Sequence, residues 1–213
     1  MKRAALGVRM HSGWGVVVAV TLGENSVEVL DRRRIVTVDP KLPGAKQPYH
    51  YAAEMGVQAQ ELPEAERYIA NCTEVSERLA ASALEEVIRD LERRSYRVTG
   101  CAVLIAAGRP LPPLARILAA HPLIHTAEGE FFRNTVRKAC EGLHIPVMTV
   151  RERELEALAK AAFGTEMSPV QKSILSAGKL VGPPWTQDHK AAALAAAMIL
   201  GQEKTIPSRR STA

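Results

Sequence analysis

The sequence predicts an α/β protein built on a mixed five-stranded sheet, with three antiparallel meander strands, then two parallel strands, and helices on the flanks. Three observations lead to this fold class. Val-rich apolar runs are joined by short turns near the start of the chain. A continuous apolar run at 98–107 is typical of a strand buried on both faces, and such strands are usually parallel to a neighbour. Segments with helical periodicity separate the later strands.

The first strands flank a tight turn at His11-Ser12-Gly13, and a second turn signal at 23–25 precedes the third strand. Connections this short join antiparallel neighbours. The third strand is interrupted by charge at 31–34, as an exposed or edge section would be. The strands are predicted at residues 4–10, 14–22, 27–38, 98–107 and 145–150.

Helix starts are predicted from N-cap residues. Thr73 and Thr126 each precede acidic residues and an apolar stripe, so both are expected to cap a helix. Thr186 or Asp188 is expected to cap the last helix. Residues 165–184 are predicted to be irregular, with a short helix at about 170–176. The helices are predicted at about 73–95, 114–120, 127–140, 151–163 and 186–200.

An insertion is predicted at about 40–72, where prolines forbid regular structure as far as Pro48 and one or two short helices follow, split near Pro63. Its Pro48-Tyr49-His50 could point into a cleft, or form a surface turn before a helix. We expect one domain over 1–200 and a polar, disordered tail over 201–213.

Composition limits the class of protein. The three cysteines have no metal-binding spacing and are odd in number, which indicates a reducing, cytoplasmic location. No apolar run reaches the roughly 18 residues of a membrane span, so no membrane partner is expected. The net charge of +5 permits an anionic partner such as nucleic acid. No feature identifies a protein partner.

The segment 121–133 carries the densest set of reactive side chains. His125, Glu128 and Glu130 could line a cleft at the end of the preceding strand. The alternative is structural, because acids at a helix start complement the helix dipole.

The order of elements resembles the ribonuclease H-like fold, and especially RuvC-like resolvases. Two motifs support the likeness over about residues 4–200: the small-residue turn LGVRMHSGWGVVV and the acid-led helix DHKAAALAAAMIL. Active members of that superfamily hold two divalent metals with clustered carboxylates. The resemblance therefore implies two-metal phosphoryl transfer, with one ion activating water and the other stabilising the leaving oxygen.

The acids that this resemblance implies are mostly absent. They would lie in strand one, at the end of strand four, and as a pair on the last helix. Arg9 occupies the first position, strand four ends in LIAAG without an acid, and Asp188 is followed by Ala191 and Ala192. We therefore expect no metal at the usual site and no cofactor, with Mg²⁺ or Mn²⁺ only if other ligands hold it.

Three functions remain open, and the sequence leaves undecided whether the protein is an enzyme. The first is a binding or structural module without two-metal nuclease activity. The second is a metal-dependent phosphodiesterase or nuclease with a relocated site, in which imidazole and carboxylate could also bind Zn²⁺. The third is non-catalytic nucleic-acid binding through arginines. The candidates for the relocated site are His11, His125, Glu128, Glu130, Asp188 and His189, and those for binding are Arg9, His11, Arg109 and the run 32–34.

Arg9 is expected to point into the cleft beside the last helix and to pair with Asp188 or Glu128, because an isolated buried charge is too costly. In the alternative, the strand register turns Arg9 outward to solvent.

Overall fold

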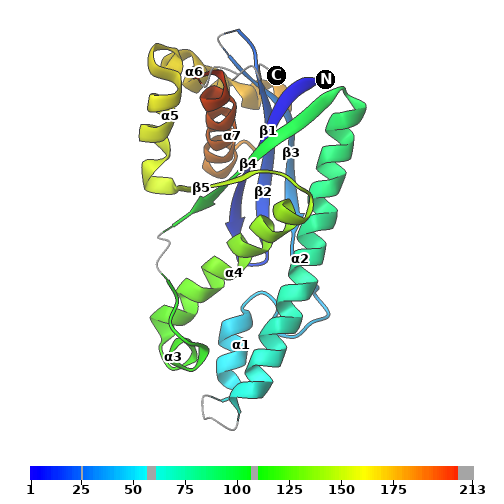
Figure 1. Ribbon diagram of the computed structural model, residues 1–213, viewed down its shortest axis with the longest axis vertical. Helices are drawn as coiled ribbons and strands as arrows, with labels where there is room; N and C mark the ends of the chain where they lie inside the picture. The colour runs from blue at the N-terminus through cyan, green and yellow to red at the C-terminus, as the bar shows by residue number, and fades with distance from the viewer. Residues whose placement is uncertain (25, 57–60, 107–109, 206–213) are drawn as a thin grey trace, which may run out of the picture.

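A five-stranded mixed sheet forms the centre of the fold, in the order β3-β2-β1-β4-β5 (Figure 1). The computed structural model describes residues 1–24, 26–56, 61–106 and 110–205. β1 pairs antiparallel with β2 and parallel with β4, β2 pairs antiparallel with β3, and β4 pairs parallel with β5. The predicted mixed sheet, with three antiparallel meander strands and then two parallel strands, is thus confirmed. The strands are β1 (Lys2–His11), β2 (Trp14–Leu22), β3 (Val27–Val36), β4 (Tyr96–Ile105) and β5 (Val147–Arg151).

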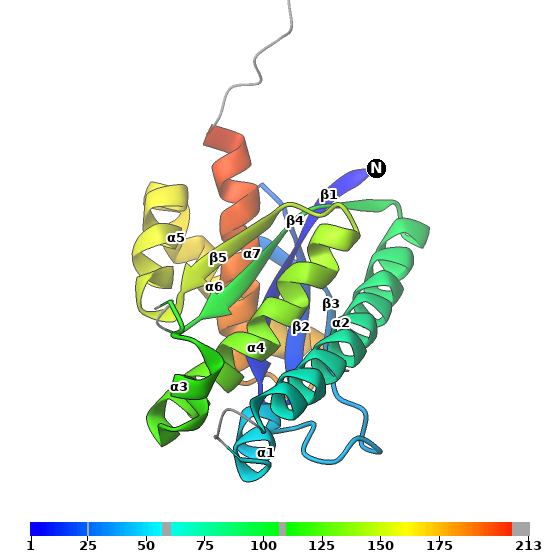
Figure 2. The same ribbon diagram turned by 60° about the horizontal axis from the view of Figure 1, so that its bottom comes forward.

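Helices cover both faces of the sheet (Figure 2). On one face α2 (Leu62–Arg93) and α4 (His121–Gly142) pack against alternate residues of β1, such as Leu6 and Val8. On the other face lie α5 (Leu155–Phe163), α6 (Met167–Val181) and α7 (Gln187–Thr205). Because successive strand residues point to opposite faces, each half of the strand pattern supplies a separate apolar core.

The approach of α7 to the sheet depends on Gly7. A Cβ built on this residue would lie 1.8 Å from the backbone oxygen of Ala192, which is far inside van der Waals contact. The Ala-rich sequence of α7 and the glycine in β1 therefore let the two backbones pack closely. This close packing fixes where the first turn of α7 lies relative to the end of β1.

Two predicted helix starts are wrong, for the same physical reason. α2 begins at Leu62 and α4 at His121, each with a proline in its first turn, where the missing N–H costs nothing. Thr73 and Thr126 lie inside these helices. Each hydroxyl donates to the carbonyl four residues earlier, at 2.8 Å and 2.9 Å respectively, so neither residue is a cap.

The predicted irregular stretch at 165–184 is mostly helix α6, and α7 continues past Gly201 to Thr205. Two short 3₁₀ turns, Glu152–Glu154 and Gly164–Glu166, flank α5.

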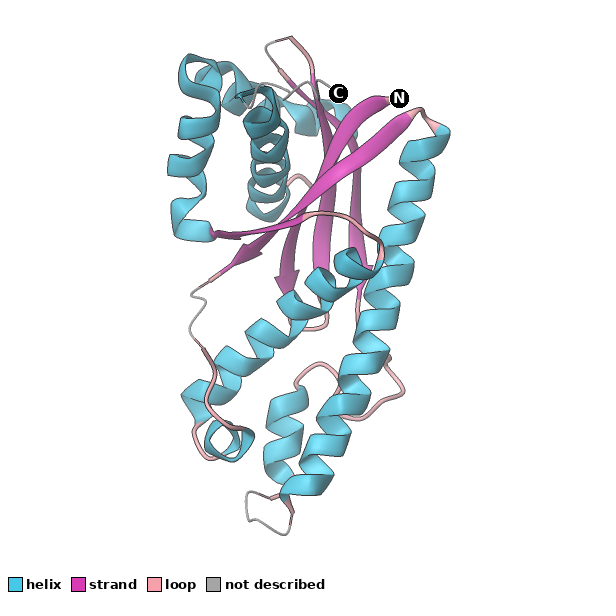
Figure 3. Ribbon diagram, in the orientation of Figure 1, coloured by secondary structure: helices cyan, strands magenta, loops and turns pink. Residues whose placement is uncertain are grey.

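A helical arm projects beyond the sheet, and Figure 3 shows that strands lie at one end of the molecule only. The arm consists of α1 (Pro48–Glu54), α3 (Leu114–Leu118) and the adjoining ends of α2 and α4. The predicted insertion at 40–72 therefore contributes α1 and the first turns of α2. Within the described ranges, no helix combines the length and the apolar character needed to cross a membrane.

Candidate functional site at the carboxyl end of β1

Arg9 lies on the α7-facing side of β1, one side-chain repeat beyond Gly7 and next to the strand end at His11. The first turn of α7 brings Asp188 to the same place, and Glu152 follows directly after β5. Ligands of α/β sheets bind beyond the carboxyl ends of parallel strands. The three residues thus gather where the topology positions a functional site.

The guanidinium of Arg9 joins two acidic residues from distant parts of the chain. Nη1 donates to Oδ1 of Asp188, and Nε and Nη2 donate to the two carboxylate oxygens of Glu152 at 3.1 Å and 3.0 Å. The latter contact is the bidentate geometry that arginine favours with carboxylates. The predicted pairing of Arg9 with Asp188 is confirmed. Glu128 is not a partner of Arg9, because it lies in the helical arm and contacts His50.

A line of stacked side chains extends this ion-pair cluster to the surface. Nε2 of His11 lies 2.8 Å from Oδ2 of Asp188. The ring of His11 stacks on Trp14 at 4.3 Å between centroids, and the exposed guanidinium of Arg34 lies 4.3 Å above the Trp14 ring. Burial alone would raise the pKa of Asp188. The hydrogen bond with His11 and the charge of Arg9 outweigh it, so that the pKa lies below its usual value.

These contacts do not fit the pair of divalent ions that the resemblance implies. Two-metal sites need several carboxylate oxygens free to coordinate. Here both oxygens of Asp188 and both oxygens of Glu152 accept hydrogen bonds, and the cation of Arg9 lies among them. A metal ion would have to displace a resident positive charge.

His189 accepts a hydrogen bond at the start of α7. The backbone N–H of Thr186 donates to Nδ1 of His189 at 3.2 Å, and the Thr186 hydroxyl lies 2.8 Å from the same nitrogen. The carbonyl of Thr186 accepts the first helical bond, from Lys190, so Thr186 is the N-cap. The imidazole takes the place of the acid in a capping box. Burial lowers the pKa of His189, and the charge of Arg32 lowers it further.

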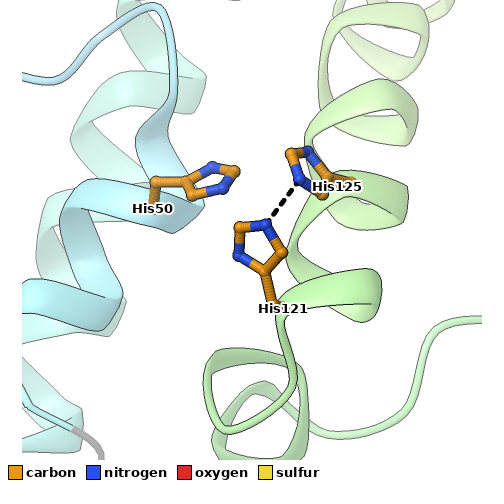
Figure 4. A group of neighbouring side chains, drawn as sticks. All are labelled: His50, His121 and His125. Carbon is orange, nitrogen blue, oxygen red and sulfur yellow. Dashed lines mark hydrogen bonds between the residues drawn. The ribbon is translucent and has the colours of Figure 1, made fainter.

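The other sequence candidates lie in the helical arm. Nδ1 of His50, on α1, lies 2.8 Å from a carboxylate oxygen of the buried Glu128, on α4. His121 and His125 face His50 from the first turns of α4, as Figure 4 shows. Glu130 pairs instead with Arg133 at 3.2 Å. The six candidates for a relocated site therefore divide between the end of the sheet and the arm.

The arginines suggested as phosphate contacts have intramolecular partners. Arg32 donates to the carbonyls of Val181, Pro183 and Pro184. Arg33 pairs with Asp31 and Asp90. Among these side chains Arg34 has its guanidinium exposed. Arg109 lies outside the described residues.

A groove of about 590 Å³ opens beside Glu152, between α5, α6 and α7. Its charged lining is mixed, with Glu156 and Arg153 on one side and Lys190 on the other. Such a lining selects neither anions nor cations by charge alone.

Three residues of these clusters, Trp14, Glu152 and His121, are not among the site candidates from the sequence. Glu152 comes immediately after a parallel strand, and that position was a usable signal. His121 stands four residues before His125, a spacing that places both on one face of a helix. The signal was obscured because the helix was expected to begin after Thr126.

Searches against protein-family models and against curated proteins find no match. Among solved structures, Thermus thermophilus RuvC in complex with a Holliday junction substrate aligns with a TM-score of 0.50 and 12% identity, covering 95% of this chain and 95% of that one. A second Thermus thermophilus RuvC structure aligns with a TM-score of 0.47 and 12% identity, covering 94% of this chain and 95% of that chain. The chain therefore has a RuvC-like ribonuclease H fold.

Proposed function

We propose that this chain is a nucleic-acid-binding module that does not carry out two-metal nuclease chemistry at the end of its sheet. The observation that carries the proposal is the double ion pair of Arg9 with Asp188 and Glu152. The guanidinium of Arg9 occupies the place where metal ions would otherwise lie among the acids of this fold. The module retains the scaffold and uses it for binding.

Three observations support nucleic acid as the ligand. The fold is that of a resolvase whose structure is known with a Holliday junction. The chain has a net charge of +5. Arg34 lies over the Trp14 ring at the surface beside the ion-pair cluster and offers an exposed cation, which suits a phosphate contact.

A cleavage assay tests the absence of nuclease activity. Untagged protein is incubated with four-way junction, duplex and RNA–DNA hybrid substrates in Mg²⁺ or Mn²⁺, with EDTA controls. We expect no metal-dependent cleavage above the EDTA control. Cleavage that disappears in Asp188→Asn would refute the proposal, because it would show that Asp188 belongs to a working metal site.

Fluorescence anisotropy tests the binding. Affinity for a junction should fall steeply between about 50 mM and about 200 mM salt, because phosphate contacts release counterions. Arg34→Ala should reduce the salt slope by about 1 if Arg34 contacts one phosphate. Lys138→Ala removes the same charge from an exposed pair with Glu141 on α4 and serves as the control. Lack of binding to junction, duplex and single strands at about 50 mM salt would refute nucleic-acid binding.

A further inference from the structure

Three histidines converge in the helical arm, far from one another in sequence but close in space. His50 comes from α1, and His121 and His125 come from successive turns of α4 (Figure 4). Each offers a ring nitrogen, and the three nitrogens lie within 4.8 Å of one another. The Nε2 atoms of His121 and His125 are 2.9 Å apart. Among the side chains that the structure describes, this is the group of three metal-ligating residues that is compact enough for one ion.

We propose that these three histidines bind a Zn²⁺ ion. Zn–N bonds of about 2.0–2.1 Å in a tetrahedral site separate the nitrogens by about 3.3 Å. Zinc binding must therefore move the Nε2 atoms of His121 and His125, now 2.9 Å apart, a few tenths of an ångström away from each other, and must bring more widely separated nitrogens closer. His121 and His125 are exposed, so rotation about their side-chain bonds meets little resistance. Imidazole nitrogens suit zinc and disfavour Mg²⁺.

The buried carboxylate of Glu128 prepares one of the three ligands. Its Oε1 lies 2.8 Å from Nδ1 of His50 and accepts a bond from the backbone N–H of the same residue at 3.2 Å. A proton on Nδ1 donates to this oxygen and leaves the lone pair of Nε2 for the metal. A carboxylate behind a ligating imidazole is the usual arrangement that orients a metal-bound histidine. Glu128 is therefore a positioning residue.

The site would tie α1 to α4 beside the apolar contacts of Tyr49 and Ala53 with Ile124 and Ala127. α1 spans Pro48–Glu54 and buries Pro48 and Ala52, and the carboxylate of Glu128 accepts from the backbone N–H of His50 in its first turn. The cluster around Ala52 includes Ala65 and Leu118 as its other fully buried members. A metal bond that spans the two helices would hold this end of the arm. With three protein ligands, the fourth tetrahedral position faces the exposed side and is open to water.

Metal binding is measured on the untagged full chain after dialysis against chelator. Isothermal titration with Zn²⁺ should give one ion per chain with a dissociation constant below about 10 µM. Zn²⁺ should also raise the melting temperature, because folding brings the three histidines together in one site. Co²⁺ in the same site should show the visible absorption of tetrahedral coordination, a readout that surface binding would not give.

Variants locate the site. His121→Ala and His125→Ala change exposed residues and should weaken Zn²⁺ binding at least 100-fold without loss of fold. His144→Asn is the matched control, since His144 is exposed, lies outside the cluster and has a φ of 57°, which asparagine tolerates. Glu128→Gln should weaken binding 10- to 100-fold. The proposal fails if wild-type protein binds no Zn²⁺ at about 100 µM, or if the His121→Ala/His125→Ala double variant binds as tightly as wild type. Neither result bears on nucleic-acid binding.

Discussion

The ion pair of Arg9 should make a measurable contribution to folding. In Arg9→Ala, Asp188 loses a charge-assisted hydrogen bond in a partly buried setting, since the two side chains are 27% and 21% exposed. Hydrogen bonds to charged groups contribute about 1.5–3 kcal/mol. Glu152 is 42% exposed, so its share is closer to that of a surface pair, about 0.2–1 kcal/mol. The free energy of unfolding should therefore fall by about 2.5 kcal/mol.

Urea denaturation followed by Trp fluorescence measures this loss. Arg9→Met retains most of the apolar stem and separates the charge effect from packing. A double-mutant cycle with Asp188→Asn should give a coupling energy of about 1.5 kcal/mol. Lys138→Ala, which breaks the exposed pair with Glu141, should change stability by less than about 0.5 kcal/mol. If Arg9→Met also stays within about 0.5 kcal/mol of wild type, the ion-pair argument is refuted.

Four further substitutions have defined outcomes. Burial lowers the pKa of His189, so the unfolded chain takes up a proton below about pH 6.5 that the folded state resists. The neutral His189 therefore contributes fully to the free energy of unfolding above that pH, and this contribution is lost as the pH falls. Urea unfolding of His189→Gln should accordingly show a weaker loss from pH 7 to pH 5.5, by up to about 1.4 kcal/mol per pH unit, and equal slopes would contradict the argument. Gly7→Ala should cost about 3 kcal/mol or more, because its Cβ would overlap Ala192. Gly142→Ala, which meets nothing within 4 Å, should be neutral or stabilising in the same denaturation. Arg9→Asp would place a third carboxylate beside Asp188 and Glu152, so Mn²⁺ should raise the melting temperature of this variant and leave that of wild type unchanged; equal responses in thermal shift would argue against the site geometry.

The sheet could be predicted closely because its signals are local. Apolar runs, short turns and a doubly buried strand indicate the number and the directions of the strands, and β2 is predicted with its observed bounds, Trp14–Leu22. Arg9 is predicted to face the last helix and to pair with Asp188 or Glu128, because an arginine in a buried strand needs a partner, and the structure selects Asp188.

Helix starts were harder to predict, because a proline can either end or begin a helix and a threonine can lie either at an N-cap or inside a helix. Pro63 is interpreted as a break and Pro122 lies between the helices predicted at 114–120 and 127–140, although a proline in a first turn begins a helix well. Thr73 and Thr126 were interpreted as caps, although their hydroxyls bond backward inside the helices. Only tertiary packing decides between these alternatives.

The ion-pair cluster at the end of the sheet was easier to predict than the histidine cluster in the arm. Glu152 could be found from its position after β5, whereas the partnership of His50 with α4 required knowing how the arm folds back. Pairing between residues this far apart in sequence leaves no periodic signal. The sequence therefore indicates His125 and Glu128 as candidates but does not group them with His50 and His121.

The length of α2 has a mechanical consequence. Its 32 residues span about 48 Å, and its C-terminal end packs on the sheet while its N-terminal end extends into the arm. Leu84, Val87 and Leu91 bury large side chains at the C-terminal end, whereas Ala65 and Cys72 bury small ones toward the arm. A tilt of α2 by about 5° about its C-terminal end would move its N-terminal end by about 4 Å. The leucine and valine contacts of α2 on the sheet, together with Phe132 and Val136 of α4, thus anchor an arm whose histidines lie several turns away.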